Sequence, residues 1–84
     1  MKYLISYDLL KPGQNYDNLV KALTQLGANR ILLSQWIIRH NSTSSATLRD
    51  YVRQHVDAND RVLVNCLDTA DWAGWNLMVD PNKM

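Results

Sequence analysis

The chain contains little that could stabilise it apart from its own core. It has 84 residues and one cysteine, Cys66, so it can form no intrachain disulfide. Cys66 lies in an apolar run and is expected to be a buried thiol. The two histidines, His40 and His55, are too few and too scattered for a zinc site. Because a domain this small buries only about 60 % of its unfolded surface, association with a second chain is the remaining common support.

Two further absences restrict the location and the partners of the protein. No apolar stretch approaches the ~20 residues of a membrane span, and Met1 leads directly into a strand-like run rather than a signal peptide. We therefore expect a cytoplasmic protein without a membrane partner. Glutamate is absent, and eight Asp against nine Lys and Arg give a net charge of +1. This total gives no strong case for nucleic acid, although five arginines could form a local patch: Arg30, Arg39, Arg49, Arg53 and Arg61.

The first third of the chain predicts a strand followed by a helix. Residues 2–8 have the composition of a strand, and a Pro-Gly turn follows at 12–13. Apolar residues then recur at helical spacing over 16–26. Asn15 is a candidate N-cap, and Gly27 is suited to end the helix.

The following residues predict two more strands, a second helix and a fourth strand. Residues 28–34 and 35–40 are strand-like, with a bend near 34–35. Residues 57–60 break the second helix, and 61–67 form the last clear strand. The apolar stripe of that helix consists of Leu48, Tyr51, Val52, His55 and Val56.

The order strand, helix, strand, strand, helix, strand predicts an α+β, ferredoxin-like βαββαβ domain. We expect a four-stranded antiparallel sheet with both helices on one face. Residues 1–84 form one domain, with a core over 1–67 and a Trp-containing tail over 68–84. A short fifth strand could form at 76–79. The two Trp residues of the tail are expected to pack on the domain or on a partner chain rather than to stack on bases.

The strands suggest that the sheet is covered on both sides. Antiparallel sheets with one wet face usually alternate apolar and polar residues. Residues 31–33 and 36–38 are apolar on both faces instead. The simplest cover for the side away from the helices is a second copy of the chain, so we expect a homodimer.

Three stretches occur in the order found in a known family. An opening strand ends in Tyr7-Asp8. Residues 26–36 carry a Gly, then an Arg, then a Ser two residues ahead of an aromatic. Residues 48–62 hold part of a helix, an acidic turn and the start of a strand. Together, over residues 1 to about 67, they resemble the CRISPR-associated Cas-two family of small spacer-acquisition proteins.

This resemblance implies a ferredoxin-like homodimer with its sheets packed face to face. It further implies that Asp8 of each subunit meets its counterpart near the two-fold axis, where the pair can hold a divalent metal. Some members of the family are metal-dependent endonucleases on RNA or duplex DNA, and others hold DNA between integrase subunits without catalysis. The positions that match by motif are Tyr7 and Asp8 as catalytic residues and Arg30, Ser34 and Trp36 as nucleic-acid contacts.

The residues themselves leave alternatives open. Asp8 either presents an acid to a ligand or merely ends the strand and caps the next turn. Two such carboxylates about 4 Å apart would repel by ~4 kcal/mol at an effective dielectric near 20, so a symmetric pair would share a proton or bind a cation. Magnesium accepts one or two carboxylates and keeps several waters. Ser34 has no His or Lys at motif spacing, which argues against a hydrolytic nucleophile.

The arginines have two interpretations as well. Arg30 and Arg39 stand at strand ends, and Arg49 and Arg53 lie on the polar face of the second helix; all four either contact phosphates or are simply solvated. The alternative functions are a non-catalytic dimer that binds nucleic acid or a partner protein, and a toxin–antitoxin-type or regulatory subunit, because ferredoxin-like folds host many functions.

Overall fold

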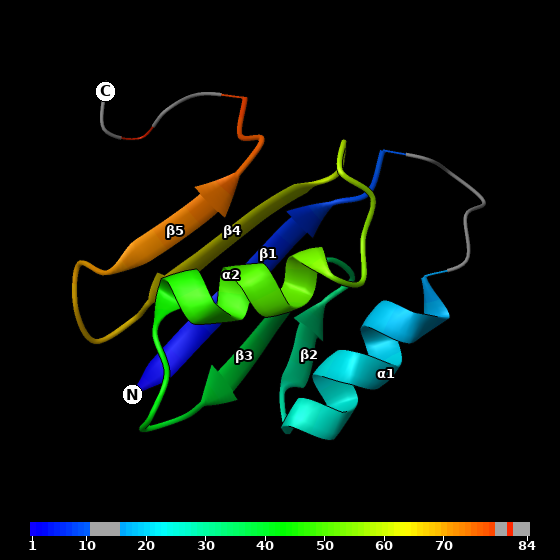
Figure 1. Ribbon diagram of the computed structural model, residues 1–84. Coiled ribbons are helices and arrows are strands. Elements are labelled where there is room, and N and C mark those ends of the chain that lie inside the picture. Colours follow the sequence, from blue (N-terminus) through cyan, green and yellow to red (C-terminus); the bar gives the residue numbers. More distant parts are fainter. Residues whose placement is uncertain (11–15, 79–80, 82–84) are drawn as a thin grey trace.

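Five strands and two helices follow one another along the chain (Figure 1). The computed structural model describes residues 1–10, 16–78 and 81. The elements are β1 (Lys2–Asp8), α1 (Asp17–Leu26), β2 (Asn29–Leu32), β3 (Gln35–Arg39), α2 (Ser45–Arg53), β4 (Arg61–Cys66) and β5 (Trp72–Trp75). The predicted order of the first six elements is confirmed, and the domain is α+β.

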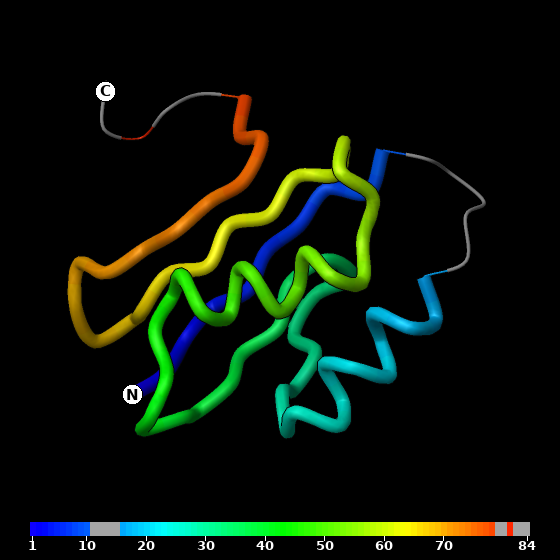
Figure 2. Tube along the Cα trace, viewed as in Figure 1, coloured from blue at the N-terminus to red at the C-terminus, as the bar shows by residue number. Residues whose placement is uncertain are grey.

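The strands form a single antiparallel sheet in the order β2-β3-β1-β4-β5, so β1 is central (Figures 1 and 2). The architecture is compatible with a ferredoxin-like fold that carries an extra strand at one edge. The fifth strand predicted at 76–79 is instead formed by Trp72–Trp75. It pairs with β4, Val62 facing Trp75, and Asn76 ends it with a φ of 57°. Residues 79–80 lie outside the described part of the chain.

The helix ends follow the predicted signals in part. Gly27 ends α1 in the left-handed conformation, with a φ of 94°, which glycine adopts without steric cost. The N-cap position of α1 is Tyr16, while the predicted Asn15 cap and the turn at 12–13 lie outside the described residues. Ser44 caps α2, its hydroxyl accepting a hydrogen bond from the Thr47 N–H at 3.1 Å.

The second helix is shorter than its apolar stripe predicts. It ends at Arg53, so His55 and Val56 lie beyond it. His55 is half-buried rather than a core residue, and its ring meets Tyr51 edge-on with centroids 5.2 Å apart. Val56 still packs against the core from outside the helix.

The hairpin between β2 and β3 also corrects a prediction. The strand expected over 28–34 stops at Leu32, and the chain turns at Leu33 and Ser34. The Arg30 guanidinium donates to the Leu33 carbonyl at 2.6 and 3.1 Å, and the Tyr7 N–H donates to the Ser34 carbonyl at 3.1 Å. These contacts close the turn and leave Leu33 83 % exposed.

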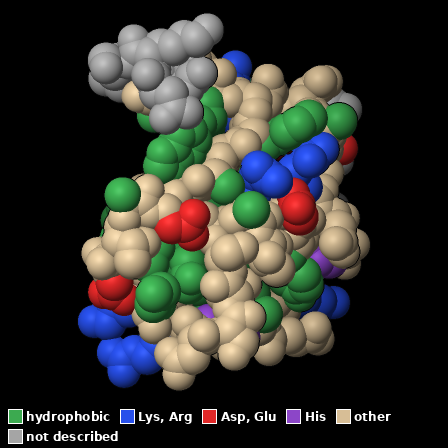
Figure 3. All heavy atoms as spheres, turned by 60° about the vertical axis from the view of Figure 1, so that its left-hand side comes forward, with side chains coloured by type: hydrophobic (Ala, Val, Ile, Leu, Met, Phe, Trp, Pro, Cys, Tyr) green, Lys and Arg blue, Asp and Glu red, His purple; other side chains and the backbone are tan. Residues whose placement is uncertain are grey.

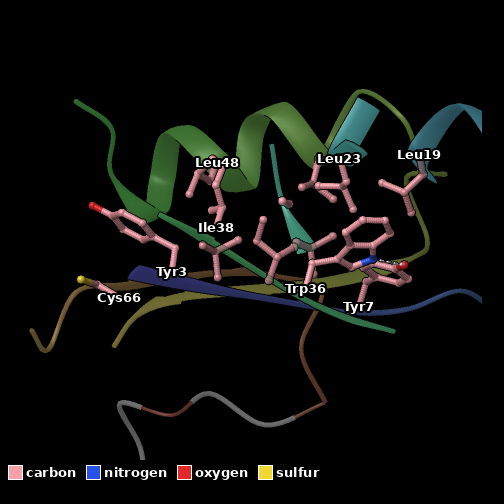
Figure 4. Packing of buried hydrophobic residues seen from close by; sticks show 13 residues of the cluster. Tyr3, Tyr7, Leu19, Leu23, Trp36, Ile38, Leu48 and Cys66 are labelled. Atoms are coloured by element: carbon pink, nitrogen blue, oxygen red, sulfur yellow. Dashed lines mark hydrogen bonds between the residues drawn. The ribbon is translucent and has the colours of Figure 1, made fainter. Parts of the chain in front are cut away.

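Both helices cover the same face of the sheet (Figure 4). The core consists of alternate strand residues such as Tyr3, Ile5 and Tyr7, packed beneath Leu19, Leu23 and Leu48 of the helices. No described helix lies on the opposite side of the sheet. We call this side the open face; in the three central strands it comprises Lys2, Leu4, Ser6, Asp8, Gln35, Ile37, Arg39, Arg61, Leu63 and Asn65. None of the described helices is both long and apolar enough to span a membrane.

Candidate functional site

Asp8 is the last residue of the central strand and lies on the open face. Successive side chains of a strand point to opposite sides of the sheet. Asp8 therefore points to the same side as Ser6 and away from the side of the buried Tyr7. Asp8 is exposed, and its side chain has neither a hydrogen bond nor an ion pair with the described residues. The carboxylate is therefore available to a ligand from solvent or from a second chain.

Arg61 is the immediate neighbour of Asp8 across the sheet. The register of β1 and β4 places the two residues directly opposite each other, and both belong to the open face. Arg61 is half-buried, and its buried Nε makes no hydrogen bond with the described residues. The two side chains form no ion pair in the described structure, although they stand on adjacent strands. The sequence predicts Arg61 only as one of five scattered arginines, because nothing local in the sequence joins it to Asp8.

Asp60, which precedes Arg61, is completely buried. Its Oδ1 accepts a hydrogen bond from the Leu10 N–H at 2.8 Å. Its Oδ2 accepts one from the Tyr16 hydroxyl at 3.1 Å and another from the Asp57 N–H at 2.9 Å. Asp60 thereby joins the segment after Asp8, the start of α1 and the turn before β4.

Tyr7 and Trp36 meet in the core, on the helix side of the sheet. They are 5 % and 4 % exposed, and the Trp36 Nε1–H donates to the Tyr7 hydroxyl at 2.9 Å (Figure 4). The Arg30 guanidinium lies over the Trp36 ring, 5.3 Å from its centroid. The structure therefore gathers three of the predicted residues, but away from the open face that carries Asp8. A catalytic role for Tyr7 and a nucleic-acid contact for Trp36 stay predictions.

The remaining predicted contacts are spread over the molecule. Ser34 is exposed in the hairpin turn, and Arg39 lies at the far end of the open face, opposite Lys2. Arg49 pairs with Asp50 at 3.0 Å. Arg53 stacks on Trp75 of β5, 3.6 Å from the ring centroid, and the Trp75 Nε1–H donates to a backbone carbonyl. In the view of Figure 3, acidic and basic side chains are interspersed rather than gathered into a patch of one sign.

The candidate metal ligand of the chain is Asp8. The described residues contain no group of three His, Cys or Asp side chains close enough to hold a metal. An exposed carboxylate without competing partners suits Mg²⁺, which takes oxygen ligands and needs only one or two carboxylates from protein. Cys66 is a buried thiol, as predicted.

Tyr3, elsewhere in the sheet, has a shifted pKa. Burial raises the pKa of the Tyr3 hydroxyl above its usual 10.0, and nearby Cys66, Asp71 and Asp68 raise it further. The hydroxyl donates to the Thr43 carbonyl at 2.9 Å. Tyr3 stands at the opposite end of β1 from Asp8, so this shift concerns stability rather than the candidate site.

No family model matches the chain. The resemblance to the Cas-two family therefore stays a prediction that rests on the order of the three stretches.

Proposed function

We propose that this protein is a ferredoxin-like homodimer, similar to the Cas-two family, that cleaves RNA or duplex DNA with Mg²⁺ held by Asp8 of each copy. One observation carries the proposal: Asp8 is an exposed carboxylate without partners among the described residues, at the end of the central strand on the open face. A two-fold axis that lies in the interface and runs along β1, or crosses β1 near Asp8, would bring two copies of Asp8 together.

The composition of the open face supports the dimer. Leu4, Ile37 and Leu63 are half-buried there. Leu63 lines a hollow together with Pro81 of the tail, so a second sheet about 10 Å away would pack chiefly over Leu4 and Ile37. Burying these side chains contributes about 25 cal/mol for each Å² of apolar surface removed from water. The dimer would thus supply the stabilisation that a single small core lacks.

The charge of a paired Asp8 site favours a cation. Two carboxylates about 4 Å apart would repel by ~4 kcal/mol at an effective dielectric near 20, and a divalent ion removes that repulsion. When bound, magnesium supplies Lewis-acid stabilisation of a phosphodiester and lowers the pKa of a bound water. Asp8 supplies the ligand oxygens and holds them at the two-fold axis.

The test compares Asp8→Asn with the wild type and with Asp50→Asn, which removes a surface carboxylate on the helix side. Cleavage of single-stranded RNA and duplex DNA is measured with Mg²⁺, with Mn²⁺ and with EDTA, and the mass by light scattering. We expect Asp8→Asn to abolish cleavage while the dimer persists, and Asp50→Asn to behave as wild type. Wild-type protein without metal-dependent cleavage, or full activity in Asp8→Asn, would overturn the proposal.

A second candidate is a dimer that binds nucleic acid without cleaving it. The charged residues of the open face favour it, since three are basic and one is acidic: Lys2, Arg39 and Arg61 against Asp8. This function predicts binding in EDTA that weakens with salt and survives Asp8→Asn. An integrase partner, which the family resemblance implies for such a scaffold, stays a prediction.

A further inference from the structure

We infer that Arg61 is a second functional residue of the Asp8 site and that its guanidinium binds a phosphate of the nucleic acid. This inference rests on the proposed function and adds to it the residue that attracts the substrate. The observation behind it is the register of β1 and β4, in which Asp8 and Arg61 face each other.

The register fixes the distance and the direction of the two side chains. Residues directly opposite on antiparallel strands have Cβ atoms about 4.5–5.5 Å apart and point to the same side of the sheet. In β4 the helix side is taken by the buried Val62, Val64 and Cys66, which leaves Arg61 on the open face. A ligand bound at Asp8 is therefore within reach of the long Arg61 side chain.

Arg61 has unused hydrogen-bonding capacity. Its guanidinium makes no hydrogen bond or ion pair with the described residues. Because the Nε–H is buried, a phosphate from solvent would meet the terminal Nη groups. A guanidinium carries five donors in a planar fork that matches the oxygens of a phosphate. By contrast, Arg30 donates to the Leu33 carbonyl, Arg49 pairs with Asp50 and Arg53 stacks on Trp75.

The charge count explains why the site needs this residue. Two Asp8 carboxylates and one divalent cation are together neutral, so they attract a phosphodiester only weakly. Arg61 from each copy adds a positive charge beside the metal position, where it can hold the substrate phosphate and stabilise the charge that develops on its oxygens.

Asp60 keeps the two side chains together. Its carboxylate accepts the Leu10 N–H at 2.8 Å, which ties the segment just beyond Asp8 to the residue just before Arg61. The adjacent ends of β1 and β4 cannot separate without breaking this buried contact. Asp60 is thus a positioning residue, and the Asp8–Arg61 pair is preorganised for its ligand.

The test uses the full chain with Arg61→Gln and Arg61→Lys, and with Lys21→Gln as a control that removes one exposed charge from α1. Binding of a fluorescent duplex is measured by anisotropy in EDTA over a range of salt. We expect Arg61→Gln to weaken binding about tenfold and to lower the salt slope by about one for each lost phosphate contact. Arg61→Lys should recover part of the affinity, and Lys21→Gln should match the wild type.

A second measurement, of Mn²⁺ affinity, should change in the opposite direction to the duplex affinity. Titration with Mn²⁺ alone reports the affinity of the Asp8 site for a divalent ion. Removing the nearby positive charge of Arg61 should tighten Mn²⁺ binding about threefold to tenfold, as expected for a unit charge several ångströms from the ion in a high dielectric. Damage to the fold would weaken the binding of both duplex and Mn²⁺. Weaker duplex binding together with tighter Mn²⁺ binding therefore indicates a functional role for Arg61 rather than a structural one.

The outcomes also separate this inference from the proposed function. If Arg61→Gln binds duplex and Mn²⁺ as the wild type does while Asp8→Asn abolishes cleavage, the role of Arg61 is overturned and the endonuclease stands. If the wild type neither cleaves nor binds Mn²⁺ but Arg61→Gln still loses duplex affinity, the endonuclease is overturned and the phosphate contact stands. Equal losses of duplex affinity in Arg61→Gln and Lys21→Gln would overturn the contact between Arg61 and a phosphate.

Discussion

Replacing Asp60 by alanine should destabilise the protein more than any other single change to its charged residues. The carboxylate is completely buried and accepts three hydrogen bonds, from Leu10, Tyr16 and Asp57, at 2.8, 3.1 and 2.9 Å. With about 1 kcal/mol for each hydrogen bond, Asp60→Ala removes ~3 kcal/mol of stability. That is most of the ~3–5 kcal/mol that a core of this size supplies.

Graded variants make the prediction measurable even if Asp60→Ala does not fold. Tyr16→Phe removes one of the three donors and should cost about 1 kcal/mol. Asp60→Asn keeps one acceptor oxygen but turns an amide N–H toward a former donor, so it should fall between Tyr16→Phe and Asp60→Ala. Asp50→Asn is the matched control, since its exposed side chain should change stability by less than about 0.5 kcal/mol.

The assay is urea unfolding at pH 7 followed by tryptophan fluorescence. With a slope of about 1 kcal/mol per molar urea for so small a domain, Asp60→Ala should lower the midpoint by ~3 M and Tyr16→Phe by ~1 M. Adding Tyr16→Phe to Asp60→Ala should lower the midpoint almost no further, because Asp60→Ala already removes the hydrogen bond that the two residues share. An Asp60→Ala midpoint within the error of the wild type would refute the reasoning.

Three further predictions concern the rest of the sheet and α2. Ser44→Ala should cost about 1 kcal/mol through the lost N-cap and Ser44→Gly only a few tenths, as measured by urea unfolding; equal effects would contradict the capping role. Tyr7→Phe strands the buried Trp36 N–H and should cost about 1–3 kcal/mol in the same assay, and a neutral result would show that the contact is dispensable. Burial raises the pKa of Tyr3 above 10.0 in the folded state, so the unfolded chain loses this proton at a lower pH than the folded chain does. The Tyr3 contribution to the free energy of unfolding is therefore complete below pH 10 and is lost as the pH rises through the folded pKa. Unfolding midpoints from about pH 8 to 11 should fall less steeply in Tyr3→Phe than in the wild type, and parallel profiles would argue against the shift.

The elements that the sequence predicted well are those set by local spacing. Residues 2–8 have the composition of a strand, and the helix from Asp17 to Leu26 shows its period directly. Gly27 ends the helix because it alone adopts the left-handed conformation without steric cost. The hairpin at Leu33 and β5 follow from contacts between distant segments. An apolar Leu33 looks like strand, but its carbonyl is held by Arg30 in a turn, and Trp72–Trp75 becomes a strand through pairing with β4.

The candidate site was predictable only in its first residue. Asp8 stands out because an acid is unusual at the end of a strand-like run. Arg61 joins it through the register of two strands that are far apart in the sequence, which no local pattern encodes. Asp60 occurs in a polar stretch that ends a helix, where burial of its carboxylate depends on donors from two other segments.

Asp8 and Asp60 carry the same side chain in opposite environments, and the environment decides whether the carboxylate stabilises the fold or is available to a ligand. The carboxylate of Asp60 is surrounded by three donors and cut off from solvent, so its oxygens are already used and it can serve no incoming ligand. The carboxylate of Asp8 has no partner among the described residues and faces outward, so the fold gains little from keeping it. A buried acid with all its contacts made stabilises the fold, whereas an exposed acid held beside an arginine is placed for a ligand. Substitution of Asp60 should therefore be read first in the unfolding free energy, and substitution of Asp8 first in metal affinity and cleavage.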